Sequence, residues 1–513
     1  MECLSVELCS VSTCVVGFVG LVIAVYKYMT WTHDTFRKMG IPGPAPGILG
    51  NMSDFAKDGL TKTDVRYVRE YGRVVGLFHA RYTVMLVSDP EMVREICVKQ
   101  FANFNKRVDP GPVDKSFRGA ITVAEDDHWK FIRSVLSPIF SSSKIKQMVS
   151  GIEKCTAQLT RNLTKLSEGG KGVEMKSVFG NYTMDVMAST GFGMEMDCQV
   201  NADNLFAKNA KEAMKFLDSK TKFVCLMFPF MKYVFEALDV GVVSLAPRKF
   251  FFGMMNEVVE DRRKSESNPR DMLDVMLTSH KLDNTLEEGD FSDAAFKFDD
   301  KKKRGLTNEE VLANSVIFLL AGYDTTSTAL TFCCYLLATN PECQERLVEE
   351  IDTEIGKDLP TYDIVMKLSY LDRVFSETLR VYPAVTRIGR KTKEATTIKG
   401  YHIPAGMSVN FPIFAMHHDP EFWAEPEKFD PDRFLPENKG QLHNYYYAPF
   451  GVGPKSCIGM RLATLTFKMT VVSILQHFRL ETTPNTEVPP ELEKGVFVKP
   501  KNGMFLQLVQ RGR

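Results

Sequence analysis

The ten residues from Phe450 to Gly459, FGVGPKSCIG, combine three glycines, a proline and a cysteine. This composition excludes a regular helix or strand and predicts a tight, ordered loop. The next residues, 460–469, have helix-forming composition, so Cys457 should lie just before a helix N-terminus. Free N–H groups and the positive end of the helix dipole favour a thiolate there, which is a strong metal ligand. An isolated cysteine is otherwise most often a buried, inert thiol.

Trp129 and Arg133 lie one turn apart on one face of a helix expected over residues 126–133. Taken alone, this pair indicates a half-buried tryptophan beside an exposed arginine. His128 is expected to be solvated rather than to bind a metal. Arg390 lies on a strand-like segment further along the chain.

A long helix is expected to begin at Thr307 and end near Thr339, before Pro341. Thr307 and Glu310 form its capping box, in which each side chain bonds the backbone N–H of the other residue.

Four residues inside this helix could support chemistry. Small side chains at Ala321 and Gly322 would let a flat group lie against the helix. Asp324 and Thr325 are poor helix formers that compete for backbone hydrogen bonds, and they could mark only a harmless kink. An acid beside an alcohol can also deliver protons to a reacting oxygen atom.

Glu377 and Arg380 are three residues apart and share a face of a helix expected over residues 371–380. Such pairs are common and usually lie on a surface. Here the pair is followed by Tyr382-Pro383 and later by the segment FDPDRF, which contains Arg433.

These motifs together are similar to those of the cytochrome P450 family. The spacing F-x-x-G-x-basic-x-C-x-G around Cys457 resembles the family's haem-binding loop, and the other motifs follow the family's order over nearly the whole chain. The residues of these motifs are most similar to those of the third P450 family of animals, whose members oxidise drugs and steroids. The resemblance implies a mainly α (α+β) fold, a helical prism with small β-sheets around a buried haem b.

The resemblance assigns the cysteine loop to the haem. Cys457 would be the axial ligand of the iron, and Phe450 would pack over the thiolate. Gly453 would permit the turn of the loop, and Gly459 would let the next helix approach the macrocycle. Lys455 stands where the family usually has arginine, so it would meet a propionate without a forked, bidentate contact.

The resemblance also assigns the remaining motifs. Trp129, Arg133 and Arg390 would bind the haem propionates. The structural network that holds the cysteine loop would consist of Glu377, Arg380 and Arg433.

The family's dioxygen site would lie on the long helix. Ala321 and Gly322 would open a groove for dioxygen, Thr325 would donate a hydrogen bond to the oxygen being activated, and Asp324 would relay protons through water.

The activity implied is insertion of one oxygen atom from dioxygen into a lipophilic substrate, such as a steroid, a fatty acid or a xenobiotic. Electrons would come from NADPH through the flavoprotein NADPH–cytochrome P450 reductase, docking nearest Cys457, with cytochrome b5 as a further candidate partner.

Two other functions remain open. A haem–thiolate isomerase or dehydratase of a lipid peroxide, similar to thromboxane synthase, would need no reductase. It would also not need the acid and alcohol at Asp324 and Thr325. A haem carrier or sensor without turnover is the third possibility, to which Lys455 gives slight support.

The composition fits a large globular protein rather than a nucleic-acid binder. The chain has 513 residues, of which 44% are hydrophobic, and its 64 basic residues balance its 64 acidic ones. Its 11 cysteines are scattered without CxxC spacing, which favours a reducing compartment over a disulfide framework or a zinc site.

The N-terminus predicts a membrane anchor. Residues 8–26 carry no charge, and this run is just long enough to span a bilayer. Lys27, Arg37 and Lys38 follow it. Positive charges on this flank place the rest of the chain in the cytosol. The alternative is a cleaved signal peptide, but no basic segment precedes the run.

We therefore expect an anchor in residues 1–30, a proline-rich hinge in residues 31–50 and a P450 catalytic domain in residues 51–513. The expected location is the endoplasmic reticulum membrane, crossed once, with the catalytic domain in the cytosol.

Four further segments complete the prediction. The run 223–255, rich in Phe and Met, is either buried core or an apolar lid that dips into a membrane surface. Residues 290–304 should form a solvated charged loop. Residues 74–87 should form a hairpin followed by a helix, and His417 and His418 should lie in a loop without a metal.

Overall fold

The computed structural model describes residues 2–109, 111–201, 204–215, 220–241, 243–264, 271–278, 305–438 and 445–512. The charged loop expected at residues 290–304 therefore lies outside the described residues.

The described chain is mainly helical. Its α-helices are α1 (Glu2–Thr30), α2 (Thr35–Lys38), α3 (Met52–Tyr71), α4 (Pro90–Arg94), α5 (Asp126–Leu136), α6 (Ser142–Glu168), α7 (Met175–Phe192), α8 (Leu205–Ala213), α9 (Lys220–Met227), α10 (Met231–Ala237), α11 (Leu245–Lys264), α12 (Met272–Thr278), α13 (Asn308–Thr339), α14 (Pro341–Glu354), α15 (Tyr362–Val365), α16 (Ser369–Val381), α17 (Ile413–His417) and α18 (Met460–His477). The helices at 126–133, 371–380 and 460–469 are thereby confirmed.

Three small sheets accompany the helices. Their orders are β1-β2-β7-β4, β3-β9-β8 and β5-β6. The strands are β1 (Val74–His79), β2 (Tyr82–Val87), β3 (Val173–Glu174), β4 (Ile388–Lys391), β5 (Thr396–Ile398), β6 (Tyr401–Ile403), β7 (Ser408–Phe411), β8 (Phe478–Thr482) and β9 (Phe505–Gln510). The expected hairpin is confirmed, because β1 and β2 pair antiparallel from Val74–Val87 to His79–Tyr82. The helix after it begins with the side chain of Asp89 as its N-cap.

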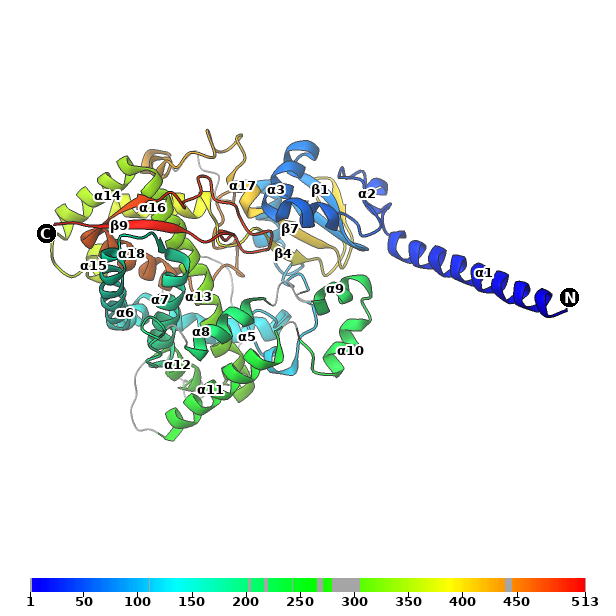
Figure 1. Cartoon of the computed structure of the whole chain (residues 1–513), viewed down its shortest axis with the longest axis horizontal. Coiled ribbons are helices and arrows are strands. Elements are labelled where there is room, and N and C mark those ends of the chain that lie inside the picture. The colour runs from blue at the N-terminus through cyan, green and yellow to red at the C-terminus, as the bar shows by residue number, and fades with distance from the viewer. Residues whose placement is uncertain are drawn as a thin grey trace.

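Helix α13 crosses the centre of the helical region, and the four-stranded sheet lies at the end nearest α1 (Figure 1). The predicted capping box is present: Thr307 Oγ1 accepts from the Glu310 N–H, and a Glu310 carboxylate oxygen accepts from the Thr307 N–H at 2.7 Å. The helix ends at Thr339, as expected. Most of its side chains are buried, so hydrophobic burial places it in the core.

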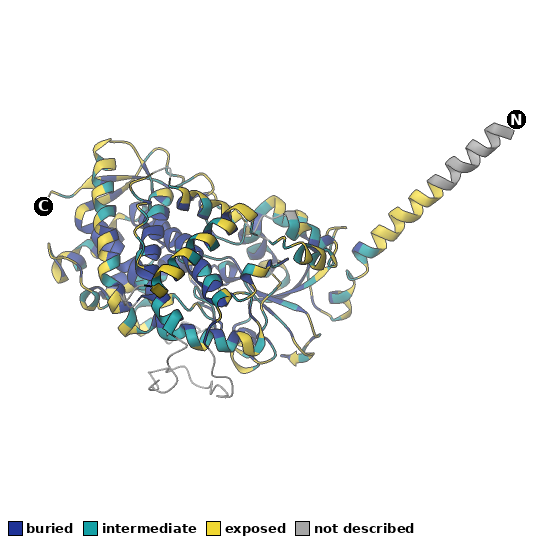
Figure 2. Cartoon of the chain, turned by 90° about the horizontal axis from the view of Figure 1, so that it is seen from below, coloured by how far each residue is buried: buried dark blue, intermediate teal, exposed yellow. Residues whose placement is uncertain are grey.

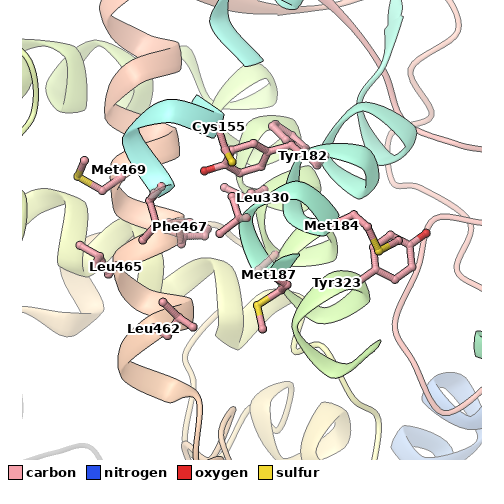
Figure 3. Close-up of a cluster of buried hydrophobic side chains, with 14 of the residues drawn as sticks. Cys155, Tyr182, Met184, Met187, Tyr323, Leu330, Leu462, Leu465, Phe467 and Met469 are labelled. Atoms are coloured by element: carbon pink, nitrogen blue, oxygen red, sulfur yellow. The ribbon is translucent and has the colours of Figure 1, made fainter. Parts of the chain in front are cut away.

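The core joins helices that are distant in sequence. Figure 3 shows side chains of α6, α7, α13 and α18 meeting in one apolar cluster that includes Met187 and Phe467. A Cβ atom at Gly322 would lie 2.7 Å from Cγ of Met187 on α7. A larger side chain at position 322 would therefore have to displace the flexible side chain of Met187.

Helix α1 projects away from the folded body, and its described residues 15–27 are exposed (Figures 1 and 2). Within the part of α1 whose side chains the structure describes, the apolar stretch Val15–Thr30 is shorter than a typical membrane span. Among the described residues, α13 meets the length and composition of a span, and its burial makes it a core helix. The crossing of a membrane by α1 stays a prediction.

The proline-rich segment is docked on the folded body along the outer edge of β1. The Gly76 N–H donates to the carbonyl of Pro42 at 2.8 Å, and the Asn51 N–H donates to the carbonyl of Phe78 at 2.7 Å. A Cβ atom at Gly43 would overlap the carbonyl oxygen of Gly76, so the two backbones touch. These contacts exclude a freely moving linker.

The loop expected at His417 and His418 is wrong for His417, whereas His418 lies in the turn after α17. His417 is the last residue of α17, and both histidines are buried. His417 Nε2 accepts a hydrogen bond from the Ala448 N–H at 3.0 Å, and His418 Nδ1 pairs with the carbonyl of Phe414 at 2.8 Å. Tertiary packing overrides the Asp-Pro signal that suggested a loop.

The segment rich in Phe and Met divides between the two expected roles. Phe251 and Met255 on α11 are buried in the core, whereas Phe223, Phe228 and Phe230 are exposed on and after α9. The segment thus begins as a surface element and ends as core.

Glu377 and Arg380 on α16 form a fully buried, bidentate ion pair, with nitrogen–oxygen distances of 2.7 and 2.8 Å. Arg433 Nε lies 3.3 Å from the same carboxylate. Arg380 also donates to the backbone carbonyls of His417, Pro426 and Lys428. The network therefore fixes the segment that leads to the cysteine loop.

Replacing Glu377 with alanine would leave the guanidinium of Arg380 buried without its carboxylate. We expect the free energy of unfolding to fall by about 3–5 kcal/mol, measured by urea titration of the circular dichroism signal.

The matched control is Glu345→Ala, which breaks the half-exposed pair of Glu345 with Arg479. This change should cost less than about 1 kcal/mol, because water already screens the pair. Equal losses in the two variants would contradict a supporting role for Glu377.

Candidate active site

The cysteine loop closes on itself immediately before α18. The Cys457 N–H donates to the carbonyl of Phe450 at 2.8 Å, and the Ser456 N–H donates to the carbonyl of Gly453 at 2.9 Å. The ring of Phe450 lies 6.2 Å from that of Phe375 on α16, so the loop packs on the helix of the buried ion pair.

Gly453 is required by the backbone around it. Its φ of +73° is a left-handed conformation, and a Cβ atom there would overlap the carbonyl oxygen of Cys97. Gly459 differs, because its φ is −87° and a Cβ atom would meet only Phe140, at 3.8 Å. Protein packing therefore explains the glycine at 453 but not the one at 459.

Cys457 is the exposed member of the described free cysteines. Burial nevertheless raises the pKa of its thiol, although a hydrogen bond from the Gly459 N–H and the charges of Arg133 and Arg107 act in the opposite direction. The side chain is exposed, yet the surrounding protein desolvates the thiol. Both hold if the sulfur lines an interior cavity that water reaches poorly. The helix N-terminus alone does not secure a thiolate, whereas a coordinated metal would.

Four positive side chains surround this loop: Arg107, Arg133, Arg390 and Lys455. Burial and the charges of Arg107 and Arg390 lower the pKa of Lys455 to about 7. Burial and the charges of Arg390 and Arg133 lower the pKa of Arg107 to about 10. Positive charges held this close together favour a negative ligand between them.

Some hydrogen-bond donors of these four side chains have no acceptor in the protein. Lys455 Nζ and Arg390 Nε are buried without a hydrogen-bond partner, although Lys455 lies 4.4 Å above the ring of Trp129. Arg133 donates to the carbonyl of Ser456 at 3.0 Å. Buried donors normally have acceptors, so these groups fit a ligand that carries carboxylates.

Trp129, Arg133, Arg390 and Lys455 were singled out from the sequence, and the structure brings them together. Arg107 was missed. It follows Asn105 and Lys106 in an irregular segment without a recognisable motif, and only the folded chain places it beside Arg390. His128 is half exposed, but its Nε2 lies 2.7 Å from a carboxylate oxygen of Glu310 and so ties α5 to α13.

The middle of α13 offers a different surface. Ala321 is exposed and Thr325 is partly exposed within an otherwise buried helix. Thr325 Oγ1 donates to the carbonyl of Ala321 at 2.7 Å. Gly322 faces Met187, so the helix packing accounts for it and a role in a dioxygen groove stays a prediction.

Asp324 points away from the bulk solvent and is held by two lysines. Lys176 Nζ lies 3.0 Å from Oδ1 and Lys499 Nζ lies 2.7 Å from Oδ2. Burial raises the pKa of Asp324, but the two lysines outweigh this effect and the net pKa is lowered. Asp324 is therefore an ionised carboxylate at neutral pH, and no sequence motif indicated its lysine partners.

The comparisons with known proteins decide the family. The family model described as "Cytochrome P450" matches residues 41–508.

The chain belongs to the cytochrome P450 family.

Several curated relatives match along nearly their whole length. The chain is 38% identical over 497 residues to Cytochrome P450 3A41 of Mus musculus, covering 96% of this chain and 95% of the relative. It is 38% identical over 494 residues to Cytochrome P450 3A6 of Oryctolagus cuniculus, covering 95% of each. It is 35% identical over 510 residues to Lithocholate 6-beta-hydroxylase of Mesocricetus auratus, covering 98% of each. The chain is thus an oxidoreductase of the P450 type.

The residues present fit the haem that this family implies. Cys457 would supply one sulfur ligand, and no cluster of three or more His, Cys, Asp or Glu in the described stretches of the chain competes as a metal site. The unpaired donors of Lys455 and Arg390 match the two carboxylates of the porphyrin. The residues that would hold the haem are Cys457, Arg107, Trp129, Arg133, Arg390 and Lys455.

Gly453 and Gly459 can be tested as a pair. Gly453→Ala should destabilise the protein by at least about 1–2 kcal/mol through the left-handed backbone alone, with the overlap at Cys97 adding to the loss. Gly459→Ala should leave the unfolding midpoint unchanged and lower only the haem content, if the macrocycle lies against position 459. Unfolding titrations and the haem-to-protein absorbance ratio distinguish the two. A stable Gly453→Ala protein with full haem would contradict the loop geometry.

Lys455 should lower the free energy of unfolding of the haem-free protein and should slow the loss of haem from the loaded protein. Lys455→Met removes a buried ammonium without a hydrogen-bond acceptor, so the haem-free protein should gain about 1–3 kcal/mol. The same change should speed haem transfer from the loaded protein to apomyoglobin. Lys468→Met is the control: Lys468 is buried but lies 2.5 Å from Asp372, so its removal should give no gain. If Lys455→Met loses stability without haem, Lys455 has another role.

Proposed function

We propose that this P450 inserts one oxygen atom from dioxygen into a lipophilic substrate, using electrons that reach haem b from NADPH through NADPH–cytochrome P450 reductase. The observation that supports this most is the cluster of Arg107, Arg133, Arg390 and Lys455 beside Cys457, with unpaired buried donors. When bound there, haem supplies the iron that activates dioxygen.

The protein's own contribution to the reaction is proton delivery and exclusion of water. Thr325 Oγ1 now donates to the carbonyl of Ala321, and rotation about χ1 would let it donate instead to an oxygen atom bound beside the exposed Ala321. The carboxylate of Asp324, one residue away, is held ionised by Lys176 and Lys499 and would relay protons through water.

Aromatic side chains and the name of one relative support a lipophilic substrate class. Phe117 and Phe252 meet edge to face at 5.1 Å, and both belong to the apolar core that reaches α13. Aromatic walls of this kind favour a lipophilic molecule. One relative is named as a hydroxylase of lithocholate, so steroids are the first class that we propose for this chain.

The proposed setting is the cytosolic face of the endoplasmic reticulum membrane. Residues 1–30 would form the single anchor, residues 31–50 the hinge and residues 51–513 the catalytic domain. The exposed apolar side chains of Trp31, Ile48 and Leu49 support contact of this end with the bilayer surface. The reductase, and cytochrome b5 as a second donor, would dock on the side nearest Cys457.

The thiolate assignment predicts a spectrum. The reduced, haem-loaded protein with carbon monoxide should show the thiolate-type absorbance, and Cys457→Ser should abolish it because the sulfur ligand is lost. Cys343→Ser, which alters a buried cysteine on α14, should keep it. Oxidation of lithocholate and other lipophilic probes should then require NADPH and reductase. Turnover of a lipid peroxide without NADPH would favour an isomerase, and an unchanged Cys457→Ser spectrum would refute the site.

A further inference from the structure

Helices α9 and α10 are weakly attached to the rest of the protein. Of the described side chains of α9 only Cys225 and Met227 are buried, and α10 buries none. An element that buries so little apolar surface separates from the body at low free energy. Its few contacts therefore decide where it lies.

The end of α9 packs on the end of α1. The rings of Tyr28 and Phe228 stack with their centroids 6.2 Å apart. Met29 and Met227 are both buried, and they share a small apolar cluster with Ala80 that is separate from the main core. In Figure 1, α9 lies beside the end of α1 that joins the body.

The turn between β1 and β2 fixes this end of α1. The guanidinium of Arg81 lies 4.1 Å from the ring centroid of Tyr28 and 4.9 Å from that of Trp31. The hydroxyl of Thr32 donates to the carbonyl of Arg81 at 2.7 Å. The last turn of α1 is thus held by the sheet, and α9 packs against a fixed point.

Helix α10 and the residues after it are bonded to the segment that follows Arg107. The contacts are the ion pair of Lys232 with Asp109 (2.6 Å), the Val113 N–H to Glu236 (3.2 Å) and the Lys115 N–H to Asp239 (2.9 Å). The ion pair of Arg248 with Asp114, at 3.1 Å, is buried. A displacement of α10 would therefore move the segment between the cation cluster and Phe117.

We propose that Tyr28, Met29 and Arg81 are positioning residues for the substrate site. They hold α9 in place, and α10 transmits this position to the segment after Arg107, which runs from the cation cluster to Phe117. The N-terminal helix would thus contribute to substrate binding as well as to attachment. The identity of the site rests on the proposed function, whereas the coupling of α1 to α9 and α10 does not.

Hydrogen–deuterium exchange of the full-length protein in lipid nanodiscs tests the coupling. Tyr28→Ala should speed exchange about fivefold in residues 221–240 and 111–117, the change expected from losing one ring contact. Tyr28→Phe keeps the ring and should restore the original rates. Tyr233→Ala truncates an exposed tyrosine of α10 and should leave both segments unchanged.

A second measurement reports on the site itself. After flash photolysis of the reduced, haem-loaded protein, carbon monoxide should rebind severalfold faster in Tyr28→Ala than in Tyr28→Phe or Tyr233→Ala. Phe228→Leu changes the other ring of the same contact and should produce both effects. This variant serves as the test if Tyr28→Ala fails to fold. Exchange changes confined to residues 15–35 would overturn the proposal, as would unchanged rates in Phe228→Leu. Protein that binds no haem would refute the proposed function, while the exchange result would still decide the coupling.

Discussion

The structure depends on holding several positive charges together in a poorly solvated interior. Arg390 and Lys455 are almost fully buried, and Arg107 and Arg133 lie close to the same cysteine loop. Like charges repel strongly where water is scarce, so this arrangement costs stability that the rest of the fold must offset. A ligand with two negative charges would relieve this repulsion, which is why the cluster indicates function better than any single motif does.

Two features of the fold offset this cost. The first is α13, whose buried side chains meet α7, α11, α16 and α18 in a single continuous core. The second is the pair of Glu377 and Arg380, in which Arg380 donates to the last backbone carbonyl of α17 and to two carbonyls of the irregular segment after it. Both features support the cysteine loop, so this loop can contain glycines in left-handed conformations and donors without acceptors.

The sequence predicted the elements of the protein that depend on local rules. The capping box at Thr307, the hairpin at 74–87 and the helix of Glu377 and Arg380 follow from spacing and propensity alone, and all are present. The features that it missed depend on contacts between distant segments. Nothing near Arg107 reveals the cation cluster, nothing near Asp324 reveals Lys176 and Lys499, and the buried surroundings of His417 override its loop-like neighbours.

The docked proline-rich segment has a consequence for solubility. Strand β1 is an outer strand of its sheet, and an outer strand with free N–H and C=O groups can pair with another molecule. Residues 42–51 take up several of these groups and cannot extend the sheet themselves, because prolines lack the N–H that a further strand would need. The segment that follows α1 thus also protects the folded body against self-association through this strand.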